Sequence, residues 1–128
     1  MNFGFVPPPY GLLWGDTKRL LDAAVRRGKN EWPEVIASLM QGTAQLWLTV
    51  TDKPIAAMVT RRDGPTLEVW LAGGAVLSGS VPFLETAIAA ARADGAKDGR
   101  IIGRRGWARV LRDYGWRESG DMLVKDFD

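Results

Sequence analysis

Three short segments with strand character follow one another in the middle of this chain, and the links between them are very short. Apolar and polar residues alternate over 45–51, and segments rich in β-formers cover 55–60 and 66–71. The links are residues 52–54 and 62–65, and both contain proline. Parallel neighbours need a connection of roughly a dozen residues or more, so these strands are predicted to form an antiparallel meander.

Apolar residues at helical spacing lie on both sides of this meander. Asp16 or Thr17 is expected to cap the first helix, and Ser80 is expected to cap the third. Glycines follow the first three patterns, as is typical of helix ends. We therefore expect four helices, at residues 17–27, 31–41, 81–94 and 105–114.

Further strands are predicted at 3–6, 99–103 and 122–127. The strand at 99–103 should lie parallel to the third meander strand, because a helix connects the two as a crossover. The fold class is therefore α+β: a mixed sheet with an antiparallel three-stranded meander and helices on both faces. We expect a single domain over residues 1–128, in which 1–13 form an extended lead-in.

The composition removes several classes of chemistry. The 128 residues include no cysteine and no histidine, which excludes disulfides, thiolate nucleophiles and histidine bases. The carboxylates show no metal-ligand spacing, so we expect no metal site. The net charge is only +2 and does not favour nucleic acid. No signal peptide or membrane-spanning run is evident, so secretion through a signal peptide is not expected.

The segments LWLTVTDKPIAAMVT, EVWLAGG and IIGRRGWARVLRDYGW, together with the order of predicted elements, resemble the GNAT acyltransferase fold. More narrowly, they resemble small GNAT-like proteins encoded among the structural genes of tailed phages and prophages. This resemblance implies a virion or host-cytoplasm location. It also implies partners among other virion or phage structural proteins, and homo-oligomers are among the options.

The same resemblance predicts where an acetyltransferase would carry its catalytic parts. The loop that binds the coenzyme A diphosphate corresponds to 72–79, which lacks the opening Arg or Gln and the usual glycine spacing. The tyrosine that acts as general acid corresponds to Leu111, which cannot donate a proton. We interpret Tyr114 as a packing residue, and Glu68 as a solvated strand residue rather than a base. We therefore expect no catalytic and no cofactor-binding residues.

Arginines recur along the last predicted helix, where they could form a basic stripe. A solvated helix face is the simpler explanation, and contact with an acidic protein or with phosphates is the functional one. The candidate interaction surface consists of Arg104, Arg105, Arg109 and Arg112.

Two functions remain open. The first is a catalytically inactive GNAT-like structural or accessory protein of a tailed phage or phage-like particle, acting through protein–protein contacts. The second is a divergent N-acetyltransferase that takes acetyl-CoA and uses Glu68, or positioning alone, for proton removal. A nucleic-acid binder is a lesser third option, and it would lose affinity steeply as salt rises.

Overall fold

The computed structural model describes residues 2–74, 81–102 and 105–127. The expected cap at Ser80, loop residues 75–79 and Arg104 lie outside these ranges. Two compact units divide the chain, Met1–Arg61 with Trp70–Ala75, and Arg62–Val69 with Val76–Asp128. The described residues form one sheet with the hydrogen-bonded order β1 (Asn2–Val6), β2 (Ala44–Val50), β3 (Pro54–Asp63), β4 (Thr66–Gly74), β5 (Asp98–Ile102), β7 (Met122–Asp126) and β6 (Arg117–Ser119). Both β3 and β4 run from one unit into the other.

The strands of the first unit begin with the predicted edge strand, β1 (Asn2–Val6). It pairs antiparallel with β2 (Ala44–Val50), placing Phe3 opposite Thr49. β2 pairs in turn with β3 (Pro54–Asp63), also antiparallel, as the short link between them requires.

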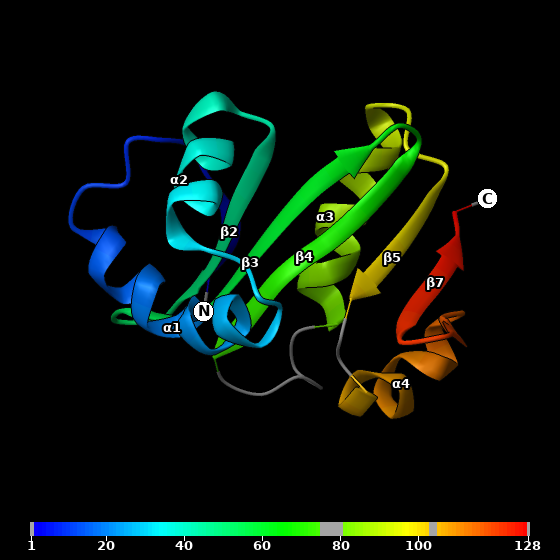
Figure 1. Ribbon diagram of the computed structural model, residues 1–128. Helices are drawn as coiled ribbons and strands as arrows, with labels where there is room; N and C mark the ends of the chain where they lie inside the picture. Colours follow the sequence, from blue (N-terminus) through cyan, green and yellow to red (C-terminus); the bar gives the residue numbers. More distant parts are fainter. Residues whose placement is uncertain (1, 75–80, 103–104, 128) are drawn as a thin grey trace. The chain divides into compact units, whose positions relative to one another are not determined.

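Two helices complete this unit, α1 (Leu13–Arg27) and α2 (Trp32–Gln41) (Figure 1). The expected cap at Asp16 or Thr17 is wrong. The helix begins earlier because the turn at Tyr10 already bonds to it, with the Leu13 N–H donating to the Tyr10 carbonyl at 3.0 Å. Thr17 is an interior residue whose hydroxyl donates to the Leu13 carbonyl at 2.8 Å. The predicted glycine ends of both helices are confirmed.

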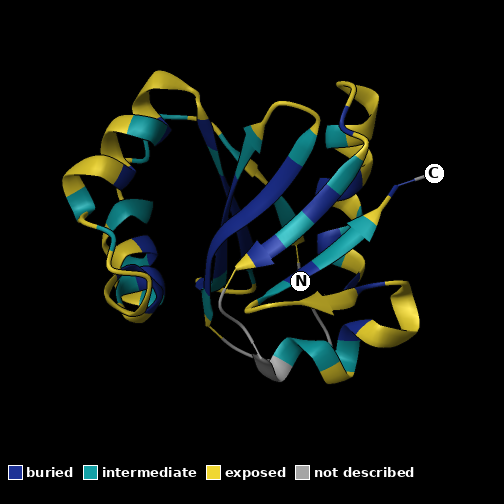
Figure 2. Ribbon diagram, turned by 45° about the vertical axis from the view of Figure 1, so that its right-hand side comes forward, coloured by how far each residue is buried: buried dark blue, intermediate teal, exposed yellow. Residues whose placement is uncertain are grey.

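The core of the first unit lies between these helices and the strands, where the inward helix faces are buried (Figure 2). The apolar residues of α2 are only partly buried: Val35 and Leu39 are inside, whereas Ile36 is 37% and Met40 is 55% exposed. Each large apolar side chain buried here contributes roughly 1.5–3 kcal/mol to stability. The fully buried members are Leu21, Val25, Val35, Leu39, Leu46, Leu48 and Val59.

The second unit contains the start of β4 and the C-terminal elements. β4 pairs parallel with β5 over four residue pairs, from Thr66–Asp98 to Val69–Ile101, which confirms the predicted parallel neighbour. β5 pairs antiparallel with β7, so the whole sheet is mixed. The bounds are β4 (Thr66–Gly74), α3 (Val81–Ala93), β5 (Asp98–Ile102), α4 (Arg105–Leu111), β6 (Arg117–Ser119) and β7 (Met122–Asp126).

Two predictions in this part need correction, and one strand was not predicted. The helix expected at 105–114 ends as an α-helix at Leu111 and continues as a 3-10 turn over Arg112–Tyr114. A short strand, β6, follows it and pairs with β7, and the alternation in three residues was too short to indicate it. β4 extends to Gly74, into the stretch expected to be a loop.

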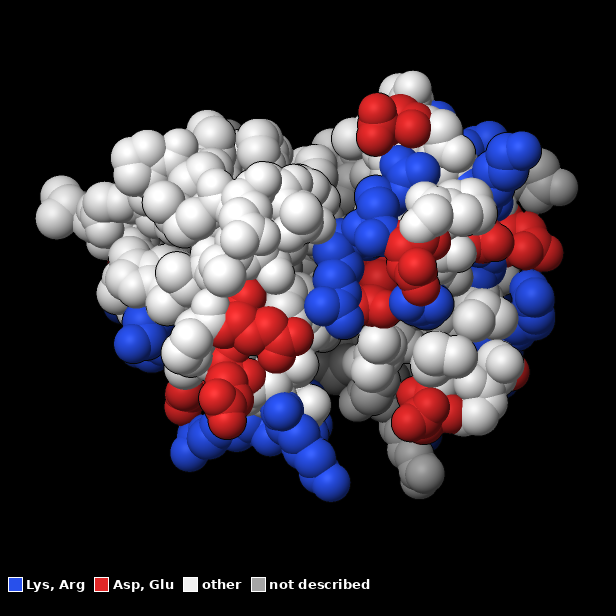
Figure 3. Space-filling view, turned by 45° about the horizontal axis from the view of Figure 1, so that its top comes forward, with Lys and Arg blue, Asp and Glu red and all other residues white. Residues whose placement is uncertain are grey.

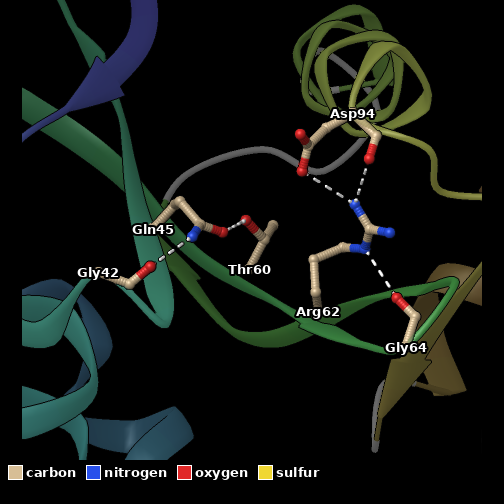
Figure 4. Close-up of polar contacts among 6 residues, drawn as sticks. All are labelled: Gly42, Gln45, Thr60, Arg62, Gly64 and Asp94. Carbon is tan, nitrogen blue, oxygen red and sulfur yellow. Dashed lines mark hydrogen bonds and ion pairs between the residues drawn. The ribbon is translucent and has the colours of Figure 1, made fainter.

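Side-chain bonds tie the turns of each unit (Figure 4). In the second unit, Arg62 donates from Nε to the Gly64 carbonyl at 3.1 Å, and its Nη1 lies 3.3 Å from the Asp94 carboxylate. In the first unit, Gln45 donates to the Gly42 carbonyl at 3.2 Å and accepts from the Thr60 hydroxyl at 3.4 Å. None of the described helices is long and apolar enough to cross a membrane.

Candidate functional site

Glu68 is a buried carboxylate in the middle of the paired segments of β4 and β5. Its register partner across the parallel ladder is Arg100. The Arg100 Nε donates to Glu68 Oε1 at 2.8 Å, and Arg100 Nη2 lies 2.7 Å from the same oxygen. The Glu68 side chain is 2% exposed, and the Arg100 side chain is 29% exposed. The parallel pairing thus places a guanidinium directly against a carboxylate that water hardly reaches.

Arg100 also joins a second carboxylate, from the end of β3. Its Nη2 lies 2.8 Å from Asp63 Oδ2, and this carboxylate is largely exposed. The hydrogen bond to Glu68, and then the one to Asp63, raise the pKa of Arg100 above its ordinary value. The guanidinium is therefore permanently charged and held by two acidic side chains.

The expectation of a solvated Glu68 is wrong. The side chain belongs to an ion pair inside the second unit because Arg100 lies opposite it on β5. Burying a carboxylate without a cation lowers the stability of the fold strongly. The ion pair with Arg100 therefore makes a buried glutamate tolerable at this strand position. The sequence did show a glutamate between apolar strand residues, which can indicate a buried carboxylate. Its partner could not be predicted, because the partner depends on the β4–β5 register.

The end of α4 is a Schellman motif. Gly115 has φ 91° and its N–H donates to the Arg112 carbonyl at 3.2 Å, while the Trp116 N–H donates to the Leu111 carbonyl at 3.3 Å. An apolar pair usually accompanies this motif, and here both Leu111 and Trp116 are buried, at 1% and 4% exposed. The same motif therefore explains why position 111 is apolar and inaccessible.

Tyr114 does not pack as expected. It lies in the 3-10 turn and its side chain is 47% exposed. An α-helix continued to residue 114 would have turned the ring differently, because a 3-10 turn advances about 120° per residue instead of about 100°. Tyr114 is thus partly exposed to solvent, whereas Leu111 three residues earlier is buried.

The glycines at the end of β4 have structural reasons of their own in the first unit. A Cβ on Gly73 would collide with the Leu20 carbonyl oxygen of α1. Gly74 has φ 107°, and a Cβ there would collide with the Ile55 carbonyl oxygen of β3. Both positions require glycine because backbone approaches backbone. Both glycines belong to β4, whereas the sequence had indicated a loop at 72–79.

The candidate arginine surface is described only in part. Arg104 lies outside the described residues, and Arg105 begins α4 without a described side chain. Arg109 is exposed on α4, and Arg112 is exposed on the 3-10 turn, so the α-helical spacing does not continue to it. On the face shown in Figure 3, basic and acidic side chains lie next to one another.

The whole described chain resembles solved acetyltransferases. The Bacillus subtilis acetyltransferase solved with CoA matches with a TM-score of 0.74 at 12% identity, covering 99% of each chain. The IAA acetyltransferase from Bacillus cereus matches with a TM-score of 0.70 at 11% identity, covering 98% of this chain and 99% of that one. A GNAT family acetyltransferase from Brucella melitensis, solved with acetyl-CoA, matches with a TM-score of 0.66 at 12% identity, covering 99% and 89%.

The chain has the GNAT fold. No protein-family model and no curated protein matches the sequence itself. The predicted fold class is therefore confirmed, and at these identities the GNAT likeness concerns the fold. Nothing in these comparisons indicates a phage or prophage origin, so that part of the resemblance gains no support.

The structure describes some of the positions that the GNAT resemblance linked to acyl transfer. Leu111, at the position expected to hold the acid, is buried hydrocarbon. Glu68, on the central strand, has one carboxylate oxygen bound to Arg100. The segment 75–80, which contains most of the expected diphosphate loop, lies outside the described residues. No group of three or more potential metal ligands occurs in the described ranges.

Proposed function

We propose that this chain is a divergent acyl-CoA-dependent N-acyltransferase. One observation carries the proposal: the GNAT fold extends over 98–99% of this chain when it is compared with acetyltransferases of similar length. Two of the similar proteins were solved with CoA or acetyl-CoA. A fold can carry unrelated functions, so the proposal needs a direct test of binding and turnover.

The reaction transfers an acyl group from a thioester to an amine. The amine nitrogen attacks the thioester carbon, the new C–N bond forms, and the C–S bond breaks. The amine loses one proton and the departing thiolate gains one, so the products are an amide and CoA. Positioning alone can contribute several kcal/mol to such a step, roughly 7–11 kcal/mol in well-oriented systems.

The residues of this chain favour positioning over side-chain proton transfer. Leu111 has no proton to donate, and its side chain is buried. Glu68 is bound by Arg100 in a network that also includes Asp63, which suits a fixed structural element better than a base that must move a proton. In this proposal water takes the amine proton and protonates the thiolate, so turnover is slow.

The test combines binding with thiol release. Acetyl-CoA that binds the native state raises the melting temperature by mass action, and ATP serves as the control nucleotide. Release of CoA can be followed with a thiol-reactive chromogen without background, because the chain contains no cysteine. A panel of primary amines supplies acceptors. Stabilisation by acetyl-CoA with amine-dependent thiol release supports the proposal, and no stabilisation at millimolar acetyl-CoA contradicts it.

A second candidate is a GNAT-fold domain that performs no transfer and acts through protein contacts, as in a phage-like particle. The burial of Leu111 and the Arg100-bound state of Glu68 favour it, because both positions are unsuited to proton transfer. This candidate predicts no amine-dependent thiol release with any acceptor. It also predicts that the protein co-purifies with a defined particle or partner.

A further inference from the structure

β1 forms an edge of the sheet and has unusually little protection against pairing. Within the described residues it has a strand neighbour on one side only, β2. Its sequence, Asn-Phe-Gly-Phe-Val, carries no charge, and Phe5 is 49% exposed. Exposed edges in natural proteins are usually shortened, charged or interrupted by proline, because alternate backbone groups point outward and can pair with another strand. Here proline begins only at Pro7, after the strand has ended.

The other end of the strand order shows the protection that β1 lacks. β6 has three residues, Arg117–Ser119, and all three are exposed. Two of them are charged, and Arg117 lies 3.7 Å from the carboxylate of Asp126 on β7. A second chain pairing along β6 would have to accommodate these charges, whereas pairing along β1 meets none.

The sequence of β1 is also self-complementary in the antiparallel sense. Gly4 is the central residue, so a two-fold axis through it pairs Gly4 with Gly4 of the partner subunit. Phe3 then lies opposite Phe5 of the partner subunit, on the same face of the sheet. In each protomer this face already holds Trp47, with ring centroids 5.5 Å from Phe3 and 5.8 Å from Phe5. The pairing would join two such aromatic groups into one row, a favourable cross-strand combination.

The protomer has space for a side chain at Gly4, so this position can be substituted to test the pairing. A Cβ at this position meets nothing within 4 Å, and its φ is not in the left-handed region. A side chain introduced at Gly4 is therefore compatible with the protomer. In the two-fold pair, by contrast, two such side chains lie directly opposite each other.

We propose that β1 is a homodimerisation edge, at which a second copy of this chain pairs antiparallel about Gly4. The interface is isologous, so the same edge is used by both protomers and the assembly closes at two. A five-residue strand buries less than a standard interface, so the dimer is concentration-dependent. The proposal does not depend on acyl transfer.

Cysteine cross-linking tests the register directly. The chain has no cysteine, so Gly4→Cys introduces a unique thiol. Opposed residues of an antiparallel pair have Cα atoms about 4.5–5.5 Å apart, within the range of a disulfide. We expect Gly4→Cys to form a covalent dimer under mild oxidation, and to do so at least ten-fold faster than Ser119→Cys on the exposed β6 edge. Equal rates for the two variants overturn the proposal.

Charge complementation tests the same pairing without a covalent bond. Gly4→Lys and Gly4→Glu should each weaken dimerisation, by roughly five-fold, because like charges then face each other at the axis. Mixing the two variants should restore dimers as a one-to-one heterodimer, measured by sedimentation over a concentration series. Thermal melts of both variants check that the protomer is intact. A wild-type chain that stays monomeric to millimolar concentration, or a mixture that behaves like its components, overturns the proposal.

Discussion

Arg100 on β5 contacts Glu68 on β4 so closely that its Nη2 lies 2.7 Å from the buried Oε1. Arg62 on β3 is almost equally exposed, at 28% against 29%, but its Asp94 partner is 86% exposed, whereas Glu68 is 2% exposed. Of these two arginines, Arg100 contacts a buried carboxylate, whereas the carboxylate that Arg62 contacts is exposed.

This difference predicts unequal effects on stability. Arg100→Ala should lower the free energy of unfolding by about 2–3 kcal/mol, because it removes a cation from a buried carboxylate. Arg62→Ala should cost less than about 1 kcal/mol, because water solvates Asp94 in its place. Urea unfolding of the two variants measures both values, and equal losses would contradict the ion-pair interpretation.

A double variant separates pairing from packing. Replacing both Glu68 and Arg100 by leucine should be less destabilising than Arg100→Leu alone, because no buried charge is left without its partner. The coupling free energy from the double-mutant cycle should be at least about 1 kcal/mol. A coupling near zero would mean that Arg100 stabilises the strand by packing only.

Two glycines of the first unit should respond to alanine in opposite directions. Gly73→Ala should destabilise by about 3 kcal/mol or more, since its Cβ would meet the Leu20 carbonyl oxygen and neither backbone can yield easily. Gly15→Ala, in α1, meets nothing within 4 Å and should stabilise by about 0.5–1 kcal/mol. Chemical unfolding measures both, and a neutral Gly73→Ala would show that α1 does not approach β4 so closely.

The sequence predicted the elements well where local signals decide them. Alternation and short links indicated the antiparallel strands, and Gly28 and Gly42 marked helix ends correctly. The start of α1 was placed too late, because the backbone bonds of the turn at Tyr10 override the capping preference of Asp16. Such turn bonds depend on conformation and have no simple residue signature.

The site was less predictable because its contacts are non-local. Glu68 and Arg100 are 32 residues apart, and their bond follows from the β4–β5 register. If β5 were shifted by one residue against β4, the two side chains would lie on opposite faces of the sheet. Gly73 likewise looks like a loop glycine until α1 is seen against it.

Tyr10 should make stability depend on alkaline pH. Burial raises the pKa of Tyr10 above its ordinary value of 10.0, so the folded state disfavours the phenolate. The stabilisation is complete below pH 10 and is lost as the pH rises through the raised pKa, because the unfolded chain then releases its proton more readily. We expect Tyr10→Phe to lose less stability than wild type between neutral pH and pH 11.

The matched control is Tyr114→Phe, which removes the other tyrosine of the chain. Tyr10→Phe should lose less stability than Tyr114→Phe across the pH series, measured as the urea midpoint. An identical loss in wild type and Tyr10→Phe would contradict the assignment to Tyr10.

Leu111 and Tyr114 should separate stability from transfer chemistry at the end of α4. Leu111→Ala should lower the free energy of unfolding by about 2–5 kcal/mol, because it empties a fully buried site beside the Schellman turn, whereas Tyr114→Ala should lower it by less than about 1 kcal/mol.

If transfer proceeds by positioning and solvent protonation, Tyr114→Phe leaves kcat within about two-fold of wild type, since no phenol proton is used. A fall of 100-fold or more in kcat with an unchanged melting temperature would instead assign the thiolate's proton to the hydroxyl of Tyr114. The inaccessible position 111 would then have been functionally replaced from the 3-10 turn that follows it.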